Sequence, residues 1–336
     1  MQEVIKEIVK RIEKMKKEEK VFVAYHFDVD GCASASIMWR ILQKIGVMAD
    51  FSPVTRGFEQ ITMDRIRKSN PTKVLLVDYV PGDEFGEFLE KYKTEIIDHH
   101  THEKHLEKFD YFTSIDYGAH FSVSYLLSLA AKELKIDDVA WLGELGAFWD
   151  KCLEGTEFFK ENIYKDEIDK MLPFNLIISL TQTKGSEKLL QMFNESSSIN
   201  EAIEKIKAID DYKRAKEIFD SELREIKFTK KSYSDVMLNI YWVKTKFKHI
   251  RIYVDYITYT APGTHVFVLD ENIRFKLSFR TSFDINLEKI IKELAHEDKN
   301  FGGGGHAQAC GAMLKNENVE ELLNKFIKKY REAMVT

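Results

Sequence analysis

Acidic and histidine side chains follow three predicted strands of this sequence, and together they could bind divalent metal ions. They are His26, Asp28 and Asp30 after 21–25, Asp78 after 73–77, and Asp98, His99 and His100 after 94–97. Alternate residues of an extended segment point to the same side, so the first three side chains should lie together. Carboxylate oxygens combined with imidazole suit manganese or magnesium better than a structural zinc.

Each group also has a simpler explanation. The first could be an Asx-rich turn whose acid caps the next helix, and the third could be a solvated polar loop. One acid after a strand is common, but three such endings are hard to explain as turns. Carboxylates that gather at one edge of a sheet repel one another unless cations lie among them. We therefore expect a metal site at the carboxyl ends of these strands, where open α/β sheets bind ligands.

A further acid, Asp150, ends the helical pattern 139–149 directly after Phe148 and Trp149. An acid after two aromatic residues is more often than average half-buried and held by a positive group. A lone acid in this place is more simply explained as a solvated helix end, so Asp150 gains meaning only from the other groups.

Four successive glycines at 302–305 precede His306. Glycine permits positive φ and a close approach of the backbone, and a loop of this kind offers several N–H groups to an anion. A linker is the alternative, but the stretch lies between a predicted helix and the strand-like 309–314, and it lacks the lysine of a P-loop. We expect a phosphate or sugar-phosphate site here. Its candidate residues are Gly303, Gly304, Gly305 and His306, with Arg280, Thr281 and Ser282 from a strand end.

The elements that must position these residues form two patterns. Strands and helices alternate along the first 190 residues, which predicts an α/β domain with a mainly parallel sheet flanked by helices. Its predicted strands are 21–25, 47–52, 73–77, 94–97 and 110–115. From Tyr233 the alternation of β-branched and aromatic residues predicts a smaller α+β domain. Its predicted strands are 238–243, 250–254, 265–269 and 274–279.

The stretch between the two patterns is a linker candidate at 195–200 followed by one long charged helix at 200–226. We therefore divide the chain into a first domain at 1–195, a helical linker at 196–232 and a second domain at 233–336.

Composition limits the class of protein. The chain has 336 residues, of which 44% are hydrophobic, and this length suits two domains. Its net charge of −5 argues against a general nucleic-acid binder. No apolar run approaches the roughly 20 residues of a membrane span, and the N-terminus lacks the apolar region of a signal peptide. Three widely spaced cysteines form neither a zinc pattern nor a disulfide framework. We expect a soluble, cytoplasmic protein.

Together, these motifs resemble the DHH phosphoesterase family, which is named for the triplet found at 98–100. The motif His-Phe-Asp-Val-Asp-Gly at 26–31 resembles the family's first motif in its archaeal RecJ-like form. Asp78 fits the second motif and Asp150 the fourth. Gly-Gly-Gly-His at 303–306 resembles the signature of the DHH-associated C-terminal domain. The resemblance covers essentially the whole chain, with the motifs in the family's order.

The resemblance implies two domains with an active-site cleft between them, and two divalent cations held by the first domain. Manganese would be preferred, with magnesium or cobalt as alternatives. One ion would be held by His26, Asp28 and Asp78, and the other by Asp30, Asp78, His99 and Asp150. Asp98 would orient His99, and His100 would face the phosphate as the catalytic histidine. The C-terminal residues, Arg280 foremost, would grip a neighbouring phosphate or terminal nucleotide.

Two activities share these motifs. The first is a manganese-dependent exonuclease on single-stranded DNA or RNA, of the RecJ-like type that acts in DNA replication and repair. The second is a phosphodiesterase or phosphatase for short oligoribonucleotides, cyclic dinucleotides or adenosine bisphosphate. A non-enzymatic scaffold is a third interpretation, which the intact ligand set disfavours. A replication or repair protein is a candidate partner, whereas polarity of degradation and oligomeric state have no sequence signal.

Overall fold

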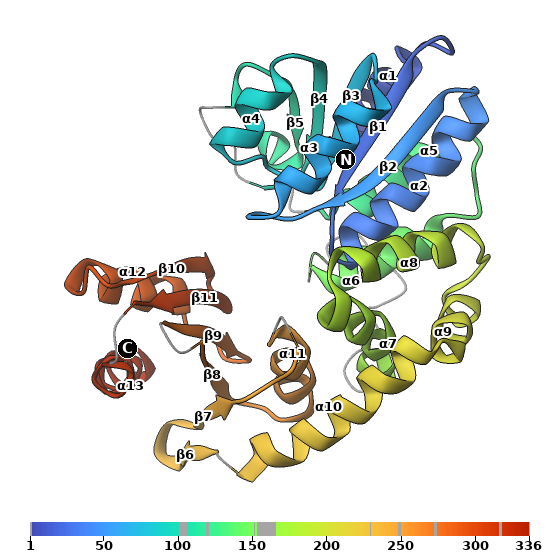
Figure 1. The fold of residues 1–336 in the computed structure, drawn as a ribbon. Coiled ribbons are helices and arrows are strands. Elements are labelled where there is room, and N and C mark those ends of the chain that lie inside the picture. Colours follow the sequence, from blue (N-terminus) through green and yellow to red (C-terminus); the bar gives the residue numbers. More distant parts are fainter. Residues whose placement is uncertain are drawn as a thin grey trace. The chain divides into compact units, whose positions relative to one another are not determined.

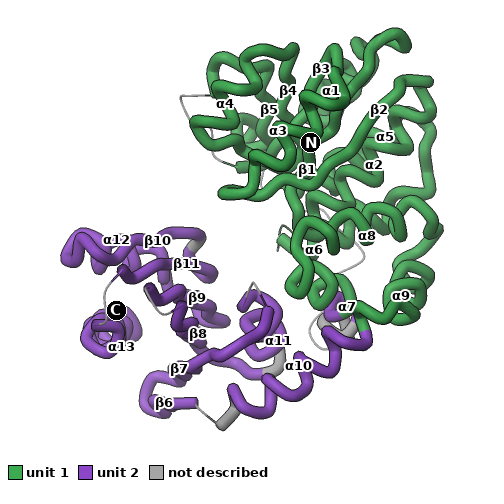
Figure 2. The backbone as a smooth tube through the Cα atoms, viewed as in Figure 1, with its two compact units in different colours: residues 1–163, 173–212 green, residues 164–172, 213–336 purple. Residues whose placement is uncertain are grey.

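The computed structural model describes residues 2–100, 106–118, 121–150, 152, 166–228, 230–247, 250–271, 274–315 and 318–335. The chain folds as two compact units (Figure 2). The first comprises residues 1–163 and 173–212, and the second comprises residues 164–172 and 213–336. Among the described residues, no helix combines the length and the apolar character that crossing a membrane requires.

The first unit is built on a five-stranded sheet with the order β2-β1-β3-β4-β5 (Figure 1). All four neighbouring pairs are parallel. The strands are β1 (Lys20–His26), β2 (Met48–Val54), β3 (Lys73–Val77), β4 (Lys93–Asp98) and β5 (Asp110–Thr113). The predicted α/β domain with a parallel sheet is therefore confirmed. Strand order changes direction between β1 and β3, and open sheets of this kind bind ligands outside the carboxyl ends at such a point.

Helices cover both faces of this sheet. Right-handed crossovers place α2 (Val29–Ile45) on one face, and they place α3 (Glu59–Ser69) and α4 (Asp83–Leu89) on the other, because the chain reverses direction after β2. Phe22 and Ala24 of β1 pack with Met63 and Ile66 of α3 in the core under the second face. Helices α1 (Gln2–Glu13), α5 (Val123–Glu133) and α6 (Ala140–Trp149) belong to the layer of α2.

The chain continues through α7 (Asp166–Thr181), α8 (Thr183–Asn194), α9 (Ile199–Ala208) and α10 (Asp210–Phe228). The predicted single helix at 200–226 is wrong, since the backbone at Ile209 is extended and separates α9 from α10. Within the predicted linker at 195–200, the Ser198 hydroxyl accepts a hydrogen bond from Glu201 N and caps α9. A serine-rich stretch fits a helix start as well as it fits a linker.

The second unit contains a mixed six-stranded sheet with the order β10-β11-β9-β8-β7-β6. The strands are β6 (Lys231–Tyr233), β7 (Leu238–Val243), β8 (Thr264–Asp270), β9 (Phe275–Thr281), β10 (Phe301–His306) and β11 (Ala309–Leu314). Helices α12 (Leu287–Glu297) and α13 (Val319–Val335) supply Leu287, Ile291 and Phe326 to the core on one face. The predicted smaller domain with its own sheet is confirmed.

Two predictions for this unit are wrong. Residues 250–254, predicted as a strand, lie in and next to α11 (Arg251–Thr260). Strands β7 and β8 are parallel neighbours, so the chain between them must cross back, which a helix does and a strand cannot. The glycines at 302–305 form the edge strand β10, not a loop, and among them Gly305 alone has a positive φ, of 146°.

Candidate metal centre

Side chains with metal-binding atoms gather at the carboxyl ends of β1, β3 and β4 and at the end of α6. Three groups have their potential ligand atoms within 4.8 Å of one another. The groups are His26, Asp28 and Asp78; Asp30, Asp78, His99 and Asp150; and Asp78, His99 and His100. The first two contain the same residues as the two ligand sets that the family resemblance implied. That these first two groups each bind an ion stays a prediction.

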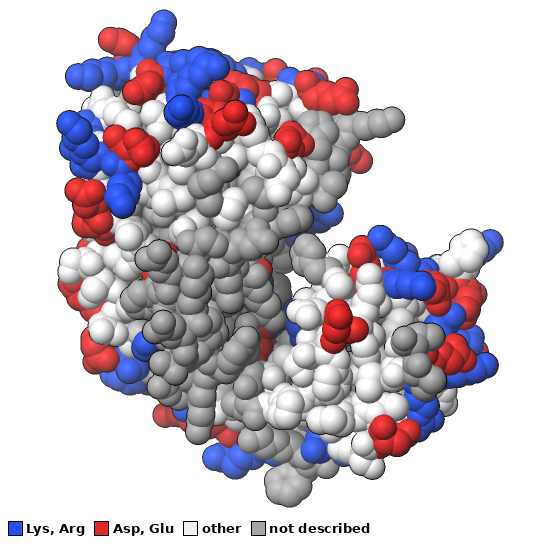
Figure 3. Space-filling view, turned by 180° about the vertical axis from the view of Figure 1, so that it is seen from behind, with Lys and Arg blue, Asp and Glu red and all other residues white. Residues whose placement is uncertain are grey.

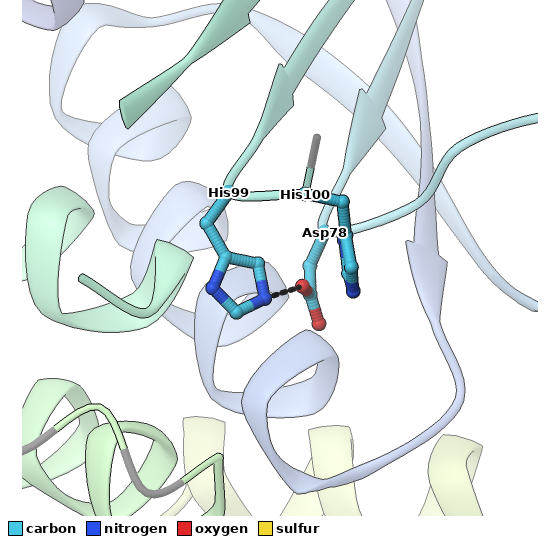
Figure 4. Close-up of side chains that lie close together, drawn as sticks. All are labelled: Asp78, His99 and His100. Atoms are coloured by element: carbon cyan, nitrogen blue, oxygen red, sulfur yellow. Dashed lines mark ion pairs between the residues drawn. The ribbon is translucent and has the colours of Figure 1, made fainter. Parts of the chain in front are cut away.

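Asp78 belongs to all three groups. It follows β3 in the left-handed region, with a φ of 58°, a conformation that aspartate adopts more readily than most residues. Its side chain is 2% exposed, and neither carboxylate oxygen accepts a hydrogen bond from the described residues. The nearby nitrogens are His99 Nε2, 3.2 Å from Oδ1 (Figure 4), and His26 Nδ1, 3.8 Å from Oδ2. Burial raises the pKa of Asp78 well above its usual value, and the charge of Asp30 adds to this.

Asp28 uses its two carboxylate oxygens differently. Oδ1 accepts a hydrogen bond from Gly31 N at 3.1 Å and caps α2, as the simpler explanation of this motif required. Oδ2 lies 3.1 Å from His26 Nδ1 and accepts a hydrogen bond from Trp149 Nε1, also at 3.1 Å. Gly31 allows this turn, because a Cβ there would lie 2.0 Å from the carbonyl oxygen of His26. Capping and metal binding are therefore compatible in one residue.

Asp30 lies in the first turn of α2 and is completely buried against the N-terminus of α5. Its Oδ2 accepts from Val123 N at 3.1 Å, and its Oδ1 accepts from Ser124 N at 3.2 Å and from the Ser124 hydroxyl. Burial, followed by the charge of Asp150, raises the pKa of Asp30 to about 7. The helix N-terminus thus fixes the direction in which this carboxylate points.

His99 lies between two carboxylates. Its Nε2 is 3.2 Å from Asp78 Oδ1 and 3.3 Å from Asp150 Oδ2. Burial opposes a charge on the ring, but the nearby carboxylates of Asp150 and Asp78 outweigh it and raise the pKa of His99 well above its usual value. In the metal-free protein a proton on His99 therefore partly replaces the positive charge that the carboxylates require.

Asp98 contacts His100, whereas we expected it to orient His99. Its Oδ1 lies 2.8 Å from His100 Nδ1, and its Oδ2 accepts from His100 N at 3.1 Å and from the Tyr111 hydroxyl at 3.2 Å. Burial pushes the pKa of Asp98 upward, but the hydrogen bond with His100 outweighs it, so the pKa is lowered. Residue Asp98 can contact its second neighbour because the chain turns directly after β4.

The ring of His100 is 55% exposed, and it lies beside Asp78 and His99 (Figure 4). With Nδ1 directed at Asp98, the other ring nitrogen is the one that can meet a ligand. This geometry suits the predicted role of His100, which no observation on this chain yet tests.

The structure supports some of the residues predicted to bind a phosphate in the second unit, and it does not support others. Arg280 is half-buried, and its Nη1 donates to the carbonyl oxygens of Phe279 at 2.9 Å and Cys310 at 3.2 Å. A Cβ at Gly304 would meet no described atom within 4 Å, whereas one at Gly303 would lie 2.5 Å from Ala312 of β11. Strand β10 is the edge strand, and β11 separates it from β9. The register places Arg280 in line with Ala309 and His306, whereas Gly304 is in line with Ser278.

The side chains of Thr281 and Ser282 make hydrogen bonds to other residues of the second unit. The Thr281 hydroxyl lies 2.6 Å from that of Thr264 and accepts from Phe283 N, inside the core. The Ser282 hydroxyl accepts from Gly263 N at 2.9 Å. Thr281 alternates with Arg280 along β9, so the two side chains face opposite sides of the sheet, and the substrate contact predicted for Thr281 has no support here. The side chain of His306 lies outside the described residues.

Sequence reasoning did not predict Ser124, Tyr111 or Trp149 as parts of the site. Each donates a hydrogen bond to a candidate carboxylate from a distant part of the chain. The one usable signal was the position of Trp149 next to Asp150. The combined donor set of carboxylates and imidazoles, with the orphaned oxygens of Asp78 at its centre, fits hard divalent cations.

Comparison with known proteins assigns the family. Residues 20–142 match the model of the DHH family, N-terminal domain, and residues 237–334 match that of the DHHA1 domain. The chain therefore has the two-domain architecture of this class, and it belongs to the DHH phosphoesterase family, as its motifs indicated. No match is found among the curated proteins.

Solved structures share the fold at low sequence identity. RecJ in complex with Mn²⁺ from Thermus thermophilus is 16% identical, with a TM-score of 0.64 over 98% of this chain and 55% of that chain. An exopolyphosphatase-related protein from Bacteroides fragilis is 15% identical, with a TM-score of 0.56 over 100% and 98%. The pGpG-specific phosphodiesterase PggH from Vibrio cholerae is 14% identical, with a TM-score of 0.52 over 94% and 99%. The chain thus spans about half the length of the Thermus RecJ chain.

Proposed function

We propose that this protein is a two-metal phosphodiester hydrolase, and specifically a manganese-dependent exonuclease for single-stranded DNA or RNA in replication or repair. The observation that carries the proposal is Asp78, a buried carboxylate shared by three ligand groups whose oxygens accept no hydrogen bond from the described part of the chain. A buried carboxylate whose nearest positive group is one histidine ring, 3.2 Å away, is costly to charge, and cations would compensate it. Two divalent cations, when bound, supply a hydroxide nucleophile near neutral pH and offset the charge of a phosphate.

The residues of the chain then position the reaction. Asp28 and Asp30 are each fixed by hydrogen bonds from helix N-termini, so their remaining lone pairs have a defined direction. In the proposal His100, held by Asp98, contacts the phosphate and is the candidate for proton transfer to the leaving oxygen. Its exposure of 55% leaves room for a substrate to reach the ring.

We further propose that residues 1–195 form the catalytic domain and that residues 233–336 form the substrate-binding domain, joined by 196–232. Arg280 and the bare edge of β10 would hold a phosphate or terminal nucleotide away from the scissile bond. Arginine suits this role because its planar donors match phosphate and its charge does not titrate. The predicted cleft between the domains stays a prediction.

The distribution of charged side chains supports binding of a substrate through a few local contacts better than binding along a uniformly basic surface. On the face shown in Figure 3, the described lysine and arginine side chains are interspersed with acidic ones. Five candidate-site aspartates contribute −5 to the formal charge, and two divalent cations would offset four of these charges. The residues are Asp28, Asp30, Asp78, Asp98 and Asp150. Affinity would then come from the ions and from contacts near the scissile bond.

A second candidate is a phosphodiesterase for small substrates, such as short oligoribonucleotides, cyclic dinucleotides or adenosine bisphosphate. A fold match over 99% of the pGpG-specific phosphodiesterase chain supports this candidate, and one over 94% of a manganese-bound exonuclease RecJ chain supports the first. Both candidates use the same metal centre, and substrate length distinguishes them.

The test is a length series of 5′- and 3′-labelled single-stranded DNA and RNA, from dinucleotides to about 40 nucleotides, incubated with Mn²⁺. Progressive shortening of long strands supports the exonuclease, and cleavage of only the shortest members supports the second candidate. Asp78→Ala and an EDTA-treated sample are the controls, and both should be inactive. If no member is cleaved, or if Asp78→Ala keeps near wild-type activity, the proposed site is wrong.

A further inference from the structure

Two consecutive residues at the end of α6 contact the two ligand groups that are predicted to bind ions. Asp150 belongs to the group with Asp30 and His99, and its Oδ2 lies 3.3 Å from His99 Nε2. Trp149 is 6% exposed, and its indole Nε1 donates to Asp28 Oδ2 at 3.1 Å, in the other group. One helix end therefore contacts both candidate ion sites.

We propose that Trp149 is a positioning residue that fixes Asp28 for metal binding, so that the end of α6 links the occupancy of the two ion sites. This inference rests on the metal centre of the proposed function. It adds a residue that neither the motifs nor the family match at 20–142 contains.

The hydrogen-bond chemistry defines the role of the indole. A carboxylate oxygen has two lone pairs, and an indole N–H is a donor that cannot itself bind a cation. When Oδ2 of Asp28 accepts from Trp149, one lone pair remains on this oxygen, which also lies 3.1 Å from His26 Nδ1. Partners that orient a metal ligand in this way typically change metal affinity 10- to 100-fold when they are lost.

The backbone of α6 keeps the indole in place. A Cβ at Gly146 would lie 2.1 Å from both Asp30 Oδ1 and the Ser124 hydroxyl, so this helix packs directly against the buried carboxylate. A Cβ at Gly143 would lie 2.2 Å from the Ser128 hydroxyl of α5. Because the helix packs closely at these two places, its backbone at Trp149 cannot move away from Asp28 without disturbing Asp30 as well.

The first experiment compares Trp149→Phe with Trp141→Phe in the full chain. Trp141 is a matched control because it lies in the same helix and its buried Nε1 makes no hydrogen bond to a described residue. Mn²⁺ binding is measured from the electron paramagnetic resonance signal of the free ion, which disappears on binding. Trp149→Phe should weaken one of two Mn²⁺ sites 10- to 100-fold, and Trp141→Phe should weaken neither. Equal affinities in wild type and Trp149→Phe would overturn the inference.

A second measurement uses the wild-type protein and needs no variant. The chain has four tryptophans, so selective ¹⁵N-tryptophan labelling gives four indole resonances. Mg²⁺ should shift the Trp149 Nε1–H resonance, and Mn²⁺ should broaden it beyond detection, while the Trp141 resonance changes less. An unmoved Trp149 resonance in a protein that binds two ions would refute the inference alone. A wild-type protein that binds no Mn²⁺ would refute the proposed function together with it.

Discussion

Replacing Asp78 by asparagine should stabilise the metal-free protein while it abolishes metal binding. The carboxylate is buried, accepts no hydrogen bond from the described residues and has a pKa well above its usual value, which means that the folded state disfavours its charge. Asparagine keeps the shape of the side chain and removes the charge, at the cost of the ion pair between Oδ1 and His99 Nε2. Because the pKa of Asp78 is raised despite its contact with His99, removing the charge should relieve the fold.

The size of the effect follows from the spacing of the ligand atoms. Carboxylate oxygens 4.8 Å apart, the limit within each group, repel by about 3.5 kcal/mol at an effective dielectric constant of 20. The charged ring of His99, 3.2 Å from Oδ1, attracts the carboxylate by about 5 kcal/mol on the same scale, so the net cost of the charge comes from burial together with the repulsion of Asp30 and Asp28. We therefore expect a gain on the order of 1–3 kcal/mol, or about 2–4 °C in Tm for each kcal/mol in a domain of this size.

The assay is thermal unfolding at pH 8, in EDTA and in saturating Mn²⁺. In EDTA, Asp78→Asn should raise Tm. In Mn²⁺, the wild type should gain about 2.7 kcal/mol for each site occupied at 100 times its Kd, and Asp78→Asn should lose this gain. Asp98→Asn is the matched control, because this carboxylate is equally buried but accepts from His100 and Tyr111 and has a lowered pKa.

The control should respond in the opposite direction. Asp98→Asn should lower Tm in EDTA, since each hydrogen bond to a charged group contributes about 1.5–3 kcal/mol. If Asp78→Asn lowers the metal-free Tm as Asp98→Asn does, the charge of Asp78 does not destabilise the metal-free fold, and the reasoning is refuted.

Further predictions test other parts of the molecule. Glu95→Ala should lower the free energy of unfolding by about 3–5 kcal/mol, because it leaves its ion-pair partner Lys73 buried alone; a loss below about 1 kcal/mol in chemical denaturation contradicts this. His100→Ala should keep Mn²⁺ affinity and lower kcat roughly 10²- to 10⁴-fold, whereas loss of both ions would mean that His100 is a metal ligand. Arg280→Ala should weaken kcat/KM by about 1.5–3 kcal/mol for nucleotide substrates but not for bis-p-nitrophenyl phosphate, and an equal loss on both would place it at the metal centre. In EDTA, stability should fall as pH rises from about 4 to about 7, because the folded-state pKa of Asp30, about 7, lies above its ordinary 3.8 and the folded state binds that proton more tightly; urea denaturation at several pH values would contradict this if stability rose over that range.

Local sequence patterns were sufficient where a residue's role depends on its own strand. Apolar or β-branched residues followed by an acid or a histidine predicted β1, β3 and β4 within one or two residues, because buried parallel strands are rich in such residues. The same runs placed His26, Asp78 and Asp98 at one edge of the sheet. The family motifs then grouped the candidate ligands as the fold does.

Tertiary structure decided what depends on neighbours distant in the chain. Residues 250–254 have strand-like composition, yet they join α11 because β7 and β8 are parallel and need a crossover. Asp98 pairs with His100, and Trp149 donates to Asp28, because a turn after β4 and the packing of α6 bring these atoms together. A sequence gives the type of each side chain and the period of its element, but hydrogen-bond partners are selected by the three-dimensional contact between elements, which no local spacing encodes.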